Sequence, residues 1–237
     1  MNFRDIYRKI ENFGVIKTLQ DLTFRALKRI IFIKIMKGVV IHNADPNFTK
    51  CTQNYRGQFL DAARLMQFSG DSANELPEQF LRDALSHGDE CYGFLHGEAL
   101  AAYGWYSNRP TPIEVPELTL HFDQQYIYMY KGFTHVNHRG QRLHAVGMTR
   151  ALEAYLARGY KGMVAYVEWN NFASLRSCDR MGFKEFGTIV VTKLFGRYIV
   201  HCTDGCGRLG FRLEAPGGKS ARRPVDGGAP AGQSIGS

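Results

Sequence analysis

Apolar side chains recur at helical spacing through the first forty residues, and basic residues lie on the other face of the predicted helices. Gly14 interrupts this pattern, so we predict one amphipathic helix on each side of it. The apolar positions are Phe3, Ile6, Tyr7, Ile10 and Phe13 before the glycine and Leu19, Leu22, Leu27, Ile30, Ile31, Ile35 and Met36 after it. The pattern therefore predicts an amphipathic, basic helical extension over residues 1–47.

From Phe48 onward the chain alternates between helical and strand-like patterns. Short apolar and aromatic runs bounded by glycine predict strands, and longer amphipathic runs predict helices. In chain order, the predicted elements are helices over 55–67 and 76–87, a hairpin over 91–96 and 99–106, a strand over 126–134, a helix over 145–158, a strand over 162–168, a helix over 172–181 and a hairpin over 185–194 and 197–202. The strand–helix–strand part implies parallel neighbours, so the fold class is α/β with a mixed, partly antiparallel sheet.

The end of the chain is rich in glycine, proline, alanine and serine and poor in apolar residues. Such a segment buries too little apolar surface to fold, and we expect a disordered tail over residues 214–237. The predicted organisation is thus the helical extension over 1–47, a folded domain over 48–213 and this tail.

Charge is concentrated near the N-terminus. The formal net charge is +8, and the first 45 residues hold nine basic and four acidic residues. The rest of the chain is close to balanced, which does not fit a uniformly basic nucleic-acid-binding protein. Two interpretations remain open for the extension: a helical segment with a solvated basic face, or a peripheral helix attracted to the anionic inner face of a membrane.

The cysteines favour a cytoplasmic protein with reduced thiols. There are five, an odd number, and their spacings are irregular, unlike a disulfide framework. His201, Cys202 and Cys206 form too sparse a set for a zinc site, so we expect no metal.

The segment Arg139-Gly-Gln-Arg-Leu-His-Ala145 lies where a predicted strand gives way to a helix. Backbone N–H groups at such a turn, with the positive end of the helix dipole, form a site for an anion. Arg139, Arg142 and the nearby Lys131 add positive charge. On these residues alone, an ordinary strand–helix loop with solvated arginines is an equal interpretation.

A second motif follows about thirty residues later. A predicted strand ends at Asn170-Asn171, and the pattern continues as Asn171-x-x-Ser174-x-x-x-Cys178-x-x-x-Gly182-Phe183. An asparagine at this place is suited to capping the helix that follows. The two motifs, in this order and at this spacing, resemble those of the GNAT superfamily of N-acyltransferases over roughly residues 55–202. The first motif is altered, because the two family glycines correspond to Arg142 and His144.

The resemblance implies a mixed, mostly antiparallel sheet with splayed parallel central strands, flanked by helices. It also implies acetyl-CoA or another acyl-CoA as co-substrate, and direct attack of a primary amine on the thioester while a base removes the amine proton. By position, the residues that would hold the donor are Phe133, Thr134, His135, Arg139, Gly140, Gln141, Arg142, Leu143, His144, Ala145 and Asn171.

Three residues are candidates for catalysis. Glu168, at the end of the strand before Asn171, is the first candidate for the base, although a plain surface carboxylate is an equal interpretation. Cys178 stands where the family has a tyrosine acid and would protonate the leaving thiolate; a buried core cysteine is the alternative. Tyr128 shares a strand face with Tyr130 and would guide water or substrate.

The altered glycine positions leave three functions open. Larger residues restrict φ and crowd a phosphate, whereas an arginine can add a charged hydrogen bond. The first function is an N-acyltransferase that uses acyl-CoA and acts on an unknown small-molecule amine. The second is an acyltransferase that takes its acyl group from acyl carrier protein, and the third is a non-catalytic GNAT-like binding module. Nucleic acid is not an expected partner.

Overall fold

A computed structural model of the chain describes residues 3–27, 32–52, 54–115 and 117–215. Its helices are α1 (Phe3–Phe13), α2 (Val15–Leu27), α3 (Ala62–Phe68), α4 (Glu78–His87), α5 (Leu143–Ala157), α6 (Phe172–Arg180) and α7 (Asp204–Arg208), with short 3-10 turns η1 (Pro46–Phe48), η2 (Ser72–Asn74) and η3 (Val136–His138). None of these helices has the length and apolar character that crossing a membrane requires.

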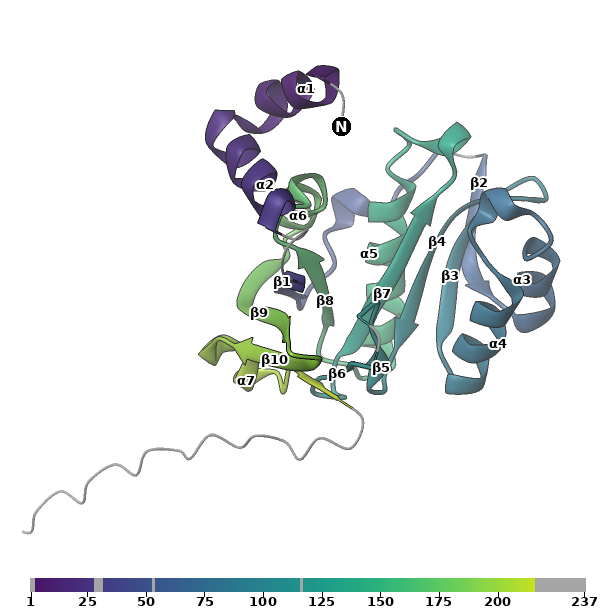
Figure 1. Cartoon of the computed structure of the whole chain (residues 1–237). Helices are drawn as coiled ribbons and strands as arrows, with labels where there is room; N and C mark the ends of the chain where they lie inside the picture. Colours follow the sequence, from purple (N-terminus) through teal and green to yellow (C-terminus); the bar gives the residue numbers. More distant parts are fainter. Residues whose placement is uncertain (1–2, 28–31, 53, 116, 216–237) are drawn as a thin grey trace, which may run out of the picture.

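The strands form two sheets (Figure 1). The large sheet has the order β10-β9-β1-β8-β7-β4-β3-β2 and consists of β1 (Phe32–Ile41), β2 (Tyr55–Leu60), β3 (Glu90–His96), β4 (Ala99–Ser107), β7 (Ile127–Thr134), β8 (Met163–Glu168), β9 (Lys184–Leu194) and β10 (Arg197–Cys202). The small sheet has the order β11-β6-β5 and consists of β5 (Thr111–Pro112), β6 (Thr119–His121) and β11 (Arg212–Glu214).

One pair in the centre of the large sheet is parallel. β7 runs parallel to β8, whereas its other pairs of neighbouring strands are antiparallel. β7 and β8 are joined by α5, which is the crossover helix that a parallel pair needs. The expected fold class, a mixed and mostly antiparallel sheet with a splayed parallel central pair flanked by helices, is confirmed.

Alternate side chains along the strands divide the core between the two faces of the sheet. One face packs against α5 and α6. The opposite face packs against α3 and α4 over β3 and β4, and against the small sheet and α7 over β1, β8 and β9. The second face is therefore covered by two separate groups of elements, one on each side of β7.

The helical extension is shorter than the sequence pattern predicts. Residues 32–41 are not helical but form β1, which lies between β8 and β9 in the sheet. Ile33, Ile35, Val39, Val40 and Ile41 are β-branched, and a strand with neighbours on both sides and cover on both faces suits such an apolar run. In the same way, residues 55–60 form the edge strand β2 and not the start of a helix.

The C-terminal boundary also differs slightly. Glu214, which the composition assigns to the tail, pairs with Thr119 as the last residue of β11. The rest of the expected disordered tail, from residue 216 on, lies outside the described residues.

The two N-terminal helices flank Gly14, as predicted, and contact the domain at α6 and just beyond β8 (Figure 1). The rings of Phe13 and Phe172 are 5.4 Å apart, and those of Phe24 and Trp169 are 5.1 Å apart. Asp21 is fully buried between the helices and the domain. The extension is therefore docked beside the end of β8, close to Asn171.

Candidate active site

The central feature of the site is the V-shaped opening between β7 and β8. The two strands are paired only at Ile127 with Met163 and at Tyr128 with Val164, and they diverge toward their carboxyl ends (Figure 1). Beyond Tyr128, the edge of β7 that faces β8 has no strand partner within the described part of the chain. An unpaired strand edge can bind an extended ligand through backbone hydrogen bonds.

A β-bulge lies at the closed end of this opening. The register between β4 and β7 shifts by one residue, so that Tyr106 pairs with Met129 and Trp105 pairs with Lys131. Tyr130 is the extra residue on β7. Because a bulge reverses the alternation of side chains, Tyr130 and Lys131 both face the side covered by α4. The Lys131 ammonium lies 4.7 Å from the centre of the Phe80 ring on α4.

The turn between β7 and α5 has the backbone geometry of an anion-binding loop. Gly140 has a φ of +82° and Arg142 a φ of +58°, and α5 begins at the next residue without a side-chain cap. The first N–H groups of α5 therefore have no side-chain partner and are available to an anion. Arg142 adopts a left-handed conformation that costs a non-glycine residue about 1–2 kcal/mol. The position of the family glycine thus keeps a glycine-like backbone.

His144 fills the space between the first turn of α5 and β7. A Cβ atom on Gly132 would lie 2.4 Å from Cε1 of this imidazole, so only glycine on β7 leaves room for it. Burial lowers the pKa of His144, and the ring is therefore neutral at pH 7. The side chain points to the strand and acts as packing in this structure.

The other residues of the turn that are predicted to bind the acyl donor are either exposed or buried. Arg139 and Gln141 are exposed, and Nε of Arg139 donates to the carbonyl of Thr134 at 3.4 Å. Leu143 and Ala145 are buried in the core, so they can offer only backbone groups to a ligand. The side chains expected to bind phosphate are therefore the two arginines of the turn, Arg139 and Arg142.

Three further predicted residues take structural positions around the opening. Phe133 stacks on Tyr103 with ring centres 5.3 Å apart, and Nδ1 of His135 accepts a hydrogen bond from the Asn137 amide at 3.3 Å. Across the opening, Oδ1 of Asn171 accepts from the Ser174 amide at 3.2 Å and caps α6. The predicted cap is present.

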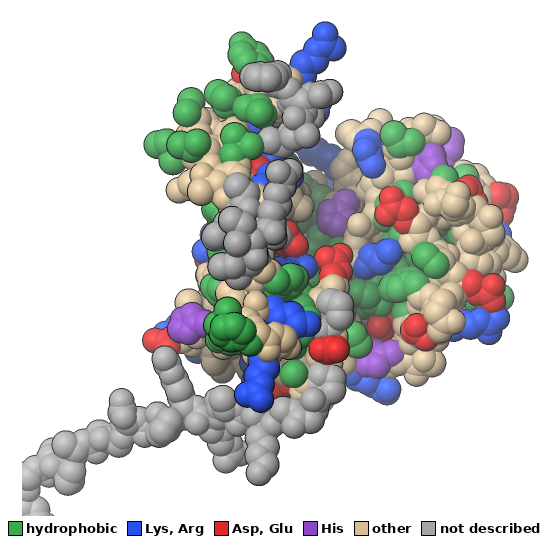
Figure 2. Space-filling view, in the orientation of Figure 1, with side chains coloured by type: hydrophobic (Ala, Val, Ile, Leu, Met, Phe, Trp, Pro, Cys, Tyr) green, Lys and Arg blue, Asp and Glu red, His purple; other side chains and the backbone are tan. Residues whose placement is uncertain are grey.

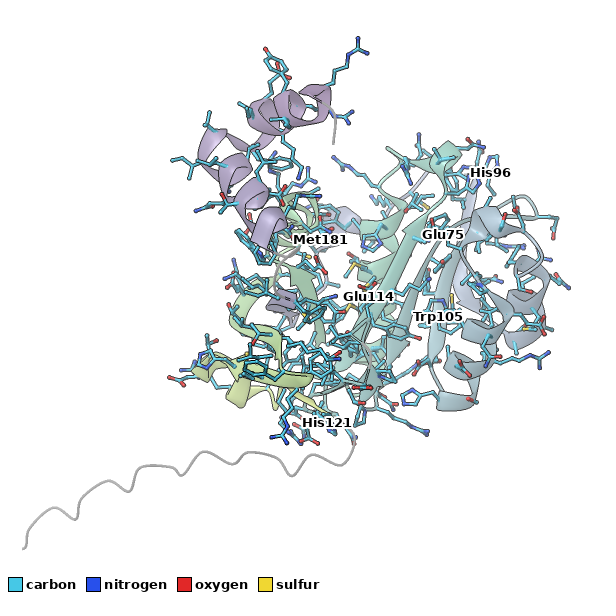
Figure 3. All side chains as sticks on the ribbon, in the orientation of Figure 1. Glu75, His96, Trp105, Glu114, His121 and Met181 are labelled. Carbon is cyan, nitrogen blue, oxygen red and sulfur yellow. The ribbon has the colours of Figure 1, made fainter. Side chains whose placement is uncertain are left out.

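Glu168 is held by a lysine that the sequence pattern does not single out. Nζ of Lys34, on β1, lies 3.0 Å from Glu168 and 3.2 Å from Glu114. Burial lowers the pKa of Lys34, but Tyr166 and the two carboxylates outweigh it, so that the net pKa is raised and the lysine is charged. Figure 3 shows Glu114 between β8 and β7. A substrate ammonium would have to compete with Lys34 for Glu168.

Cys178 and Tyr128 are both enclosed. Cys178 packs in the core under α6, and burial raises the pKa of its thiol to about 11. Tyr128 is 1% exposed, and burial raises its pKa well above the usual value. Its ring lies 6.0 Å from that of Tyr130 and 6.4 Å from that of Tyr166. These positions favour the core interpretation of Cys178 and make Tyr128 the floor of the site, without direct access to substrate.

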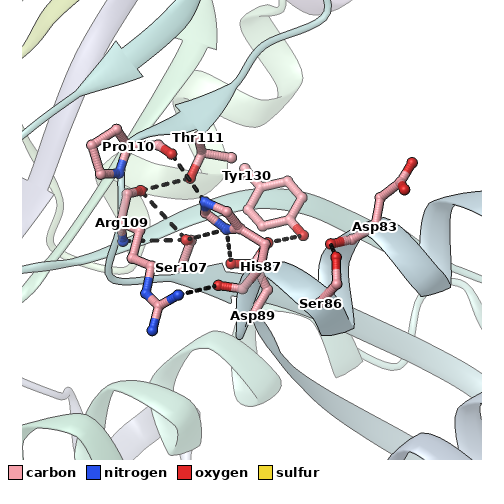
Figure 4. A network of polar contacts seen from close by, with 9 residues as sticks. All are labelled: Asp83, Ser86, His87, Asp89, Ser107, Arg109, Pro110, Thr111 and Tyr130. Carbon is pink, nitrogen blue, oxygen red and sulfur yellow. Dashed lines mark hydrogen bonds and ion pairs between the residues drawn. The ribbon is translucent and has the colours of Figure 1, made fainter.

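A polar network beside the opening joins Tyr130 to His87 and Asp89, two residues that the sequence pattern does not single out (Figure 4). The Tyr130 hydroxyl donates to Oδ2 of Asp89 at 2.8 Å, and Nδ1 of His87 lies 2.7 Å from Oδ1 of the same carboxylate. His87 ends α4 and Asp89 precedes β3, so the three residues come from separate elements. Only the position of Tyr130 on the same strand face as Tyr128 offers a signal in the sequence.

Neither protein-family models nor curated proteins give a match to this sequence. Among solved structures, the chain is similar to a Drosophila melanogaster protein with 12% identity and a TM-score of 0.48, covering 75% of this chain and 57% of that one. A GCN5-related N-acetyltransferase-like protein from Streptococcus suis has 9% identity and a TM-score of 0.47, covering 75% and 67%. An acetyltransferase from the GNAT family of Colwellia psychrerythraea has 18% identity and a TM-score of 0.46, covering 72% and 60%. The chain thus spans less than two thirds of the Drosophila and Colwellia proteins, and these likenesses concern the fold alone.

Proposed function

We propose that this chain is a GNAT-type N-acyltransferase, which moves an acetyl or longer acyl group from acyl-CoA to the primary amine of a small molecule. The observation that carries the proposal is the opening between β7 and β8. It combines a parallel pair with two paired positions, a bulge at Tyr130 and a left-handed turn at Arg142 that begins α5. Together with the two sequence motifs, this geometry provides a place for a pyrophosphate and for an extended arm.

The donor would bind along β7. Its pyrophosphate would lie at the N-terminus of α5, where Arg139 and Arg142 add charge to the N–H groups of the first turn. The pantetheine arm would follow the unpaired edge of β7 from Thr134 toward the closed end of the opening. The thioester then lies nearest to Tyr130, at the bulge.

The reaction requires an uncharged amine at that point. The amine nitrogen attacks the thioester carbon, the carbon–sulfur bond breaks, and the thiolate leaves with a proton. Binding and orienting both substrates supplies a large part of such catalysis, and proton transfer supplies roughly 10²–10⁴-fold. Glu168 remains a candidate for the base, with the pairing to Lys34 as the argument against it.

We expect Arg139→Ala to weaken the binding of acetyl-CoA about tenfold, because one charged phosphate contact contributes roughly 1.4 kcal/mol. Calorimetric titration of the purified full chain with acetyl-CoA and with a long-chain acyl-CoA measures this, and the preferred length indicates the acyl group. Arg82→Ala is the matched control, since Arg82 is an exposed arginine on α4 that pairs with Glu78. Equal binding by wild type and Arg139→Ala would contradict the assignment of the turn.

The same titration separates the alternatives. If neither acyl-CoA binds at micromolar concentration, an acyl-CoA-dependent enzyme is excluded, and acyl carrier protein becomes the donor to titrate next. A chain that binds neither donor is the non-catalytic module. In that case, the replacement of the two family glycines by Arg142 and His144 would explain why the donor does not bind.

We further propose that the extension attaches the protein to an anionic lipid surface. Val15, Ile16 and Leu19 are exposed on one side of α2, whereas Asp21 and Phe24 are buried on the other. Figure 2 shows hydrophobic side chains gathered over α1 and α2 on the side away from the sheet. The excess of basic residues in the first 45 positions complements an anionic bilayer.

We expect the double variant Ile16→Glu and Leu19→Glu to lose at least tenfold in binding to vesicles that contain phosphatidylglycerol, because each apolar side chain contributes about 1.5–3 kcal/mol on burial. Co-sedimentation of the full chain with such vesicles, compared with pure phosphatidylcholine, is the measurement. The double variant Ile16→Gln and Leu19→Gln removes the same apolar side chains without adding charge, and it should lose binding as well. Removal of residues 1–40 is unsuitable as a test, because it also removes β1 from the centre of the sheet. Absence of wild-type binding to the anionic vesicles would exclude this attachment.

A further inference from the structure

A cleft of about 500 Å³ opens on the face of the sheet that α4 covers. Its lining includes Phe80, Asp83, His87, Asp89, Thr111 and Tyr130. The whole chain carries a net charge of +8, yet the ionisable residues named in this lining are two aspartates and a histidine, together with the Tyr130 phenol. Two aromatic rings form part of the same wall. Acidic and aromatic groups together suit a cation, in particular an ammonium group.

The carboxylate at the end of this cleft is buried and hydrogen-bonded on both oxygens. The Asp89 side chain is 4% exposed. It accepts from the Tyr130 hydroxyl at 2.8 Å and contacts Nδ1 of His87 at 2.7 Å, while Nε2 of His87 lies 3.1 Å from the Pro110 carbonyl (Figure 4). Because a carbonyl oxygen only accepts, Nε2 carries a hydrogen. His87 therefore holds the carboxylate from one side and Tyr130 holds it from the other.

Tyr130 connects this network to the opening between β7 and β8. It is the bulged residue of β7, and its side chain is half-buried, so it lines the cleft while its backbone lies at the closed end of the opening. Burial and the Asp89 carboxylate raise the pKa of the phenol far above its usual value, so it stays protonated at neutral pH. Its hydroxyl donates to Asp89 and retains lone pairs that can accept from a ligand.

We propose that Tyr130, Asp89 and His87 form the ammonium-binding and proton-accepting end of the acceptor site. This inference rests on the proposed function, since it names the acceptor side of the same reaction. The substrate is a primary ammonium on an apolar or aromatic body. Its charge is held by the Asp89 carboxylate, and its body lies against Phe80 and Tyr130.

One ammonium proton moves to the Tyr130 oxygen while the phenol proton moves to Oδ2 of Asp89, which leaves a neutral amine and a protonated carboxyl group. The amine nitrogen then bonds to the thioester carbon, and the carbon–sulfur bond breaks. The second nitrogen proton goes to the departing thiolate, and Asp89 returns its proton to water. His87, which is hydrogen-bonded to Asp89 and to the Pro110 carbonyl, positions the carboxylate.

Other charged or titratable groups surround the network. Asp83 on α4 lines the cleft. The buried Cys91 thiol on β3 contributes to the raised pKa of the Tyr130 phenol. The Arg109 guanidinium donates to the His87 carbonyl at 3.1 Å, and Lys131 lies on the Phe80 ring. Arg109 and Lys131 thus interact with the His87 carbonyl and the Phe80 ring, and not with the Asp89 carboxylate. Glu168 differs from Asp89, because the Lys34 ammonium lies 3.0 Å from Oε1 of Glu168.

The test uses the full chain with phenethylammonium chloride as the probe. Calorimetric titration is expected to show binding in the millimolar range for wild type and at least tenfold weaker binding for Asp89→Asn, which keeps the size of the side chain. Asp179→Asn, on α6, is the matched control and should bind as wild type does. Thermal unfolding of each variant verifies that it is folded.

The proton-transfer step is tested by thiol release from acetyl-CoA with the same amine across a pH series. Tyr130→Phe, which removes only the hydroxyl, is expected to bind the amine within about threefold of wild type and to lower the rate roughly 100-fold. Because a variant without this relay reacts only with amine that is already uncharged, the deficit of Tyr130→Phe and Asp89→Asn relative to wild type should shrink as the pH rises.

Each outcome decides the inference separately from the proposed function. Binding of acetyl-CoA without binding of phenethylammonium leaves the function standing and overturns this assignment of the cleft. Equal amine binding by wild type and Asp89→Asn overturns it as well. Wild-type binding of the amine without thiol release, or undiminished release by Tyr130→Phe, overturns the proton transfer. Failure of acetyl-CoA to bind contradicts the proposed function, while the amine titration still decides the ammonium site.

Discussion

Replacement of Gly162 by alanine is expected to lower the free energy of unfolding by more than about 3 kcal/mol, because conformational strain and steric overlap coincide there. The φ angle of Gly162 is +157°, and an added Cβ would lie 2.3 Å from the carbonyl oxygen of Ile41. That oxygen belongs to the backbone of β1 and cannot rotate away. The Gly162 carbonyl also accepts from the Ile127 amide at 3.0 Å. The residue therefore determines how β8 meets β1 and β7 at the closed end of the site.

Gly159→Ala provides a matched control from the same loop. Gly159 has a φ of +93°, but no atom lies within 4 Å of an added Cβ. It should therefore cost only the conformational term of about 1–2 kcal/mol. Urea unfolding followed by circular dichroism compares the two variants. If Gly162→Ala is no more destabilising than Gly159→Ala, the close approach of β1 and β8 is not a constraint on the fold.

Asp21→Ala is expected to release α1 and α2 from the domain, at a cost of about 3 kcal/mol. The carboxylate is fully buried and accepts from Lys9 at 2.6 Å, from Arg25 at 2.8 Å and from Nδ2 of Asn170 at 2.9 Å. Its removal leaves two cations and an amide without their partner. Lys9 and Arg25 are 25% and 51% exposed and can regain water, which places the cost at the low end of the range for a broken buried pair.

Limited proteolysis provides the readout, since cleavage within residues 3–27 should precede loss of the domain's circular dichroism signal. Glu11→Ala, at an exposed position on α1, is the control and should change stability by less than about 0.5 kcal/mol. Simultaneous loss of the helices and of the whole fold would show that the extension is part of the cooperative unit and not a separately docked element.

The same carboxylate predicts a pH dependence. Burial raises the pKa of Asp21, but its bonds to Lys9, Asn170 and Arg25 outweigh burial, and the net pKa lies below the ordinary value of 3.8. A lowered pKa in the folded state means that the stabilisation is fully present above the ordinary value and is lost as the pH falls through the lowered one. The helices should therefore stay docked at pH 5 and become protease-sensitive only on stronger acidification. An Asp21→Asn variant should lack this transition.

Several features of the site could be predicted from the sequence because they depend on short stretches of chain. The turn at 139–145, the asparagine cap at Asn171 and the two helices around Gly14 are local patterns, and the structure contains each of them. At Arg142, the departure from the motif is compatible with the expected backbone, since the residue adopts a left-handed φ of +58°. Local geometry is thus retained there even though the side chain is different.

Other features depend on residues that are distant in the sequence. The apolar run over Ile33–Ile41 is compatible with a helix or with a strand. Its pairing with β8 on one side and β9 on the other determines that it forms the strand β1. The bulge at Tyr130 arises from the register with β4, which side-chain alternation on β7 does not encode. Lys34 lies more than a hundred residues before Glu168 and pairs with it because β1 enters beside β8. The contact between Asp89 and Tyr130 likewise requires α4 and β7 to meet.

By itself, the sequence determined the order and type of most elements, the α/β class, the two motifs and the concentration of positive charge at the N-terminus. These follow from periodicity, composition and turn chemistry over short ranges. Only the tertiary structure decided that β1 completes the sheet, that Cys178 and Tyr128 are enclosed, and that Asp89, His87 and Tyr130 meet at one end of a cleft. Burial and charge pairing are properties of the packed chain, because they depend on which distant segments exclude water from a given side chain.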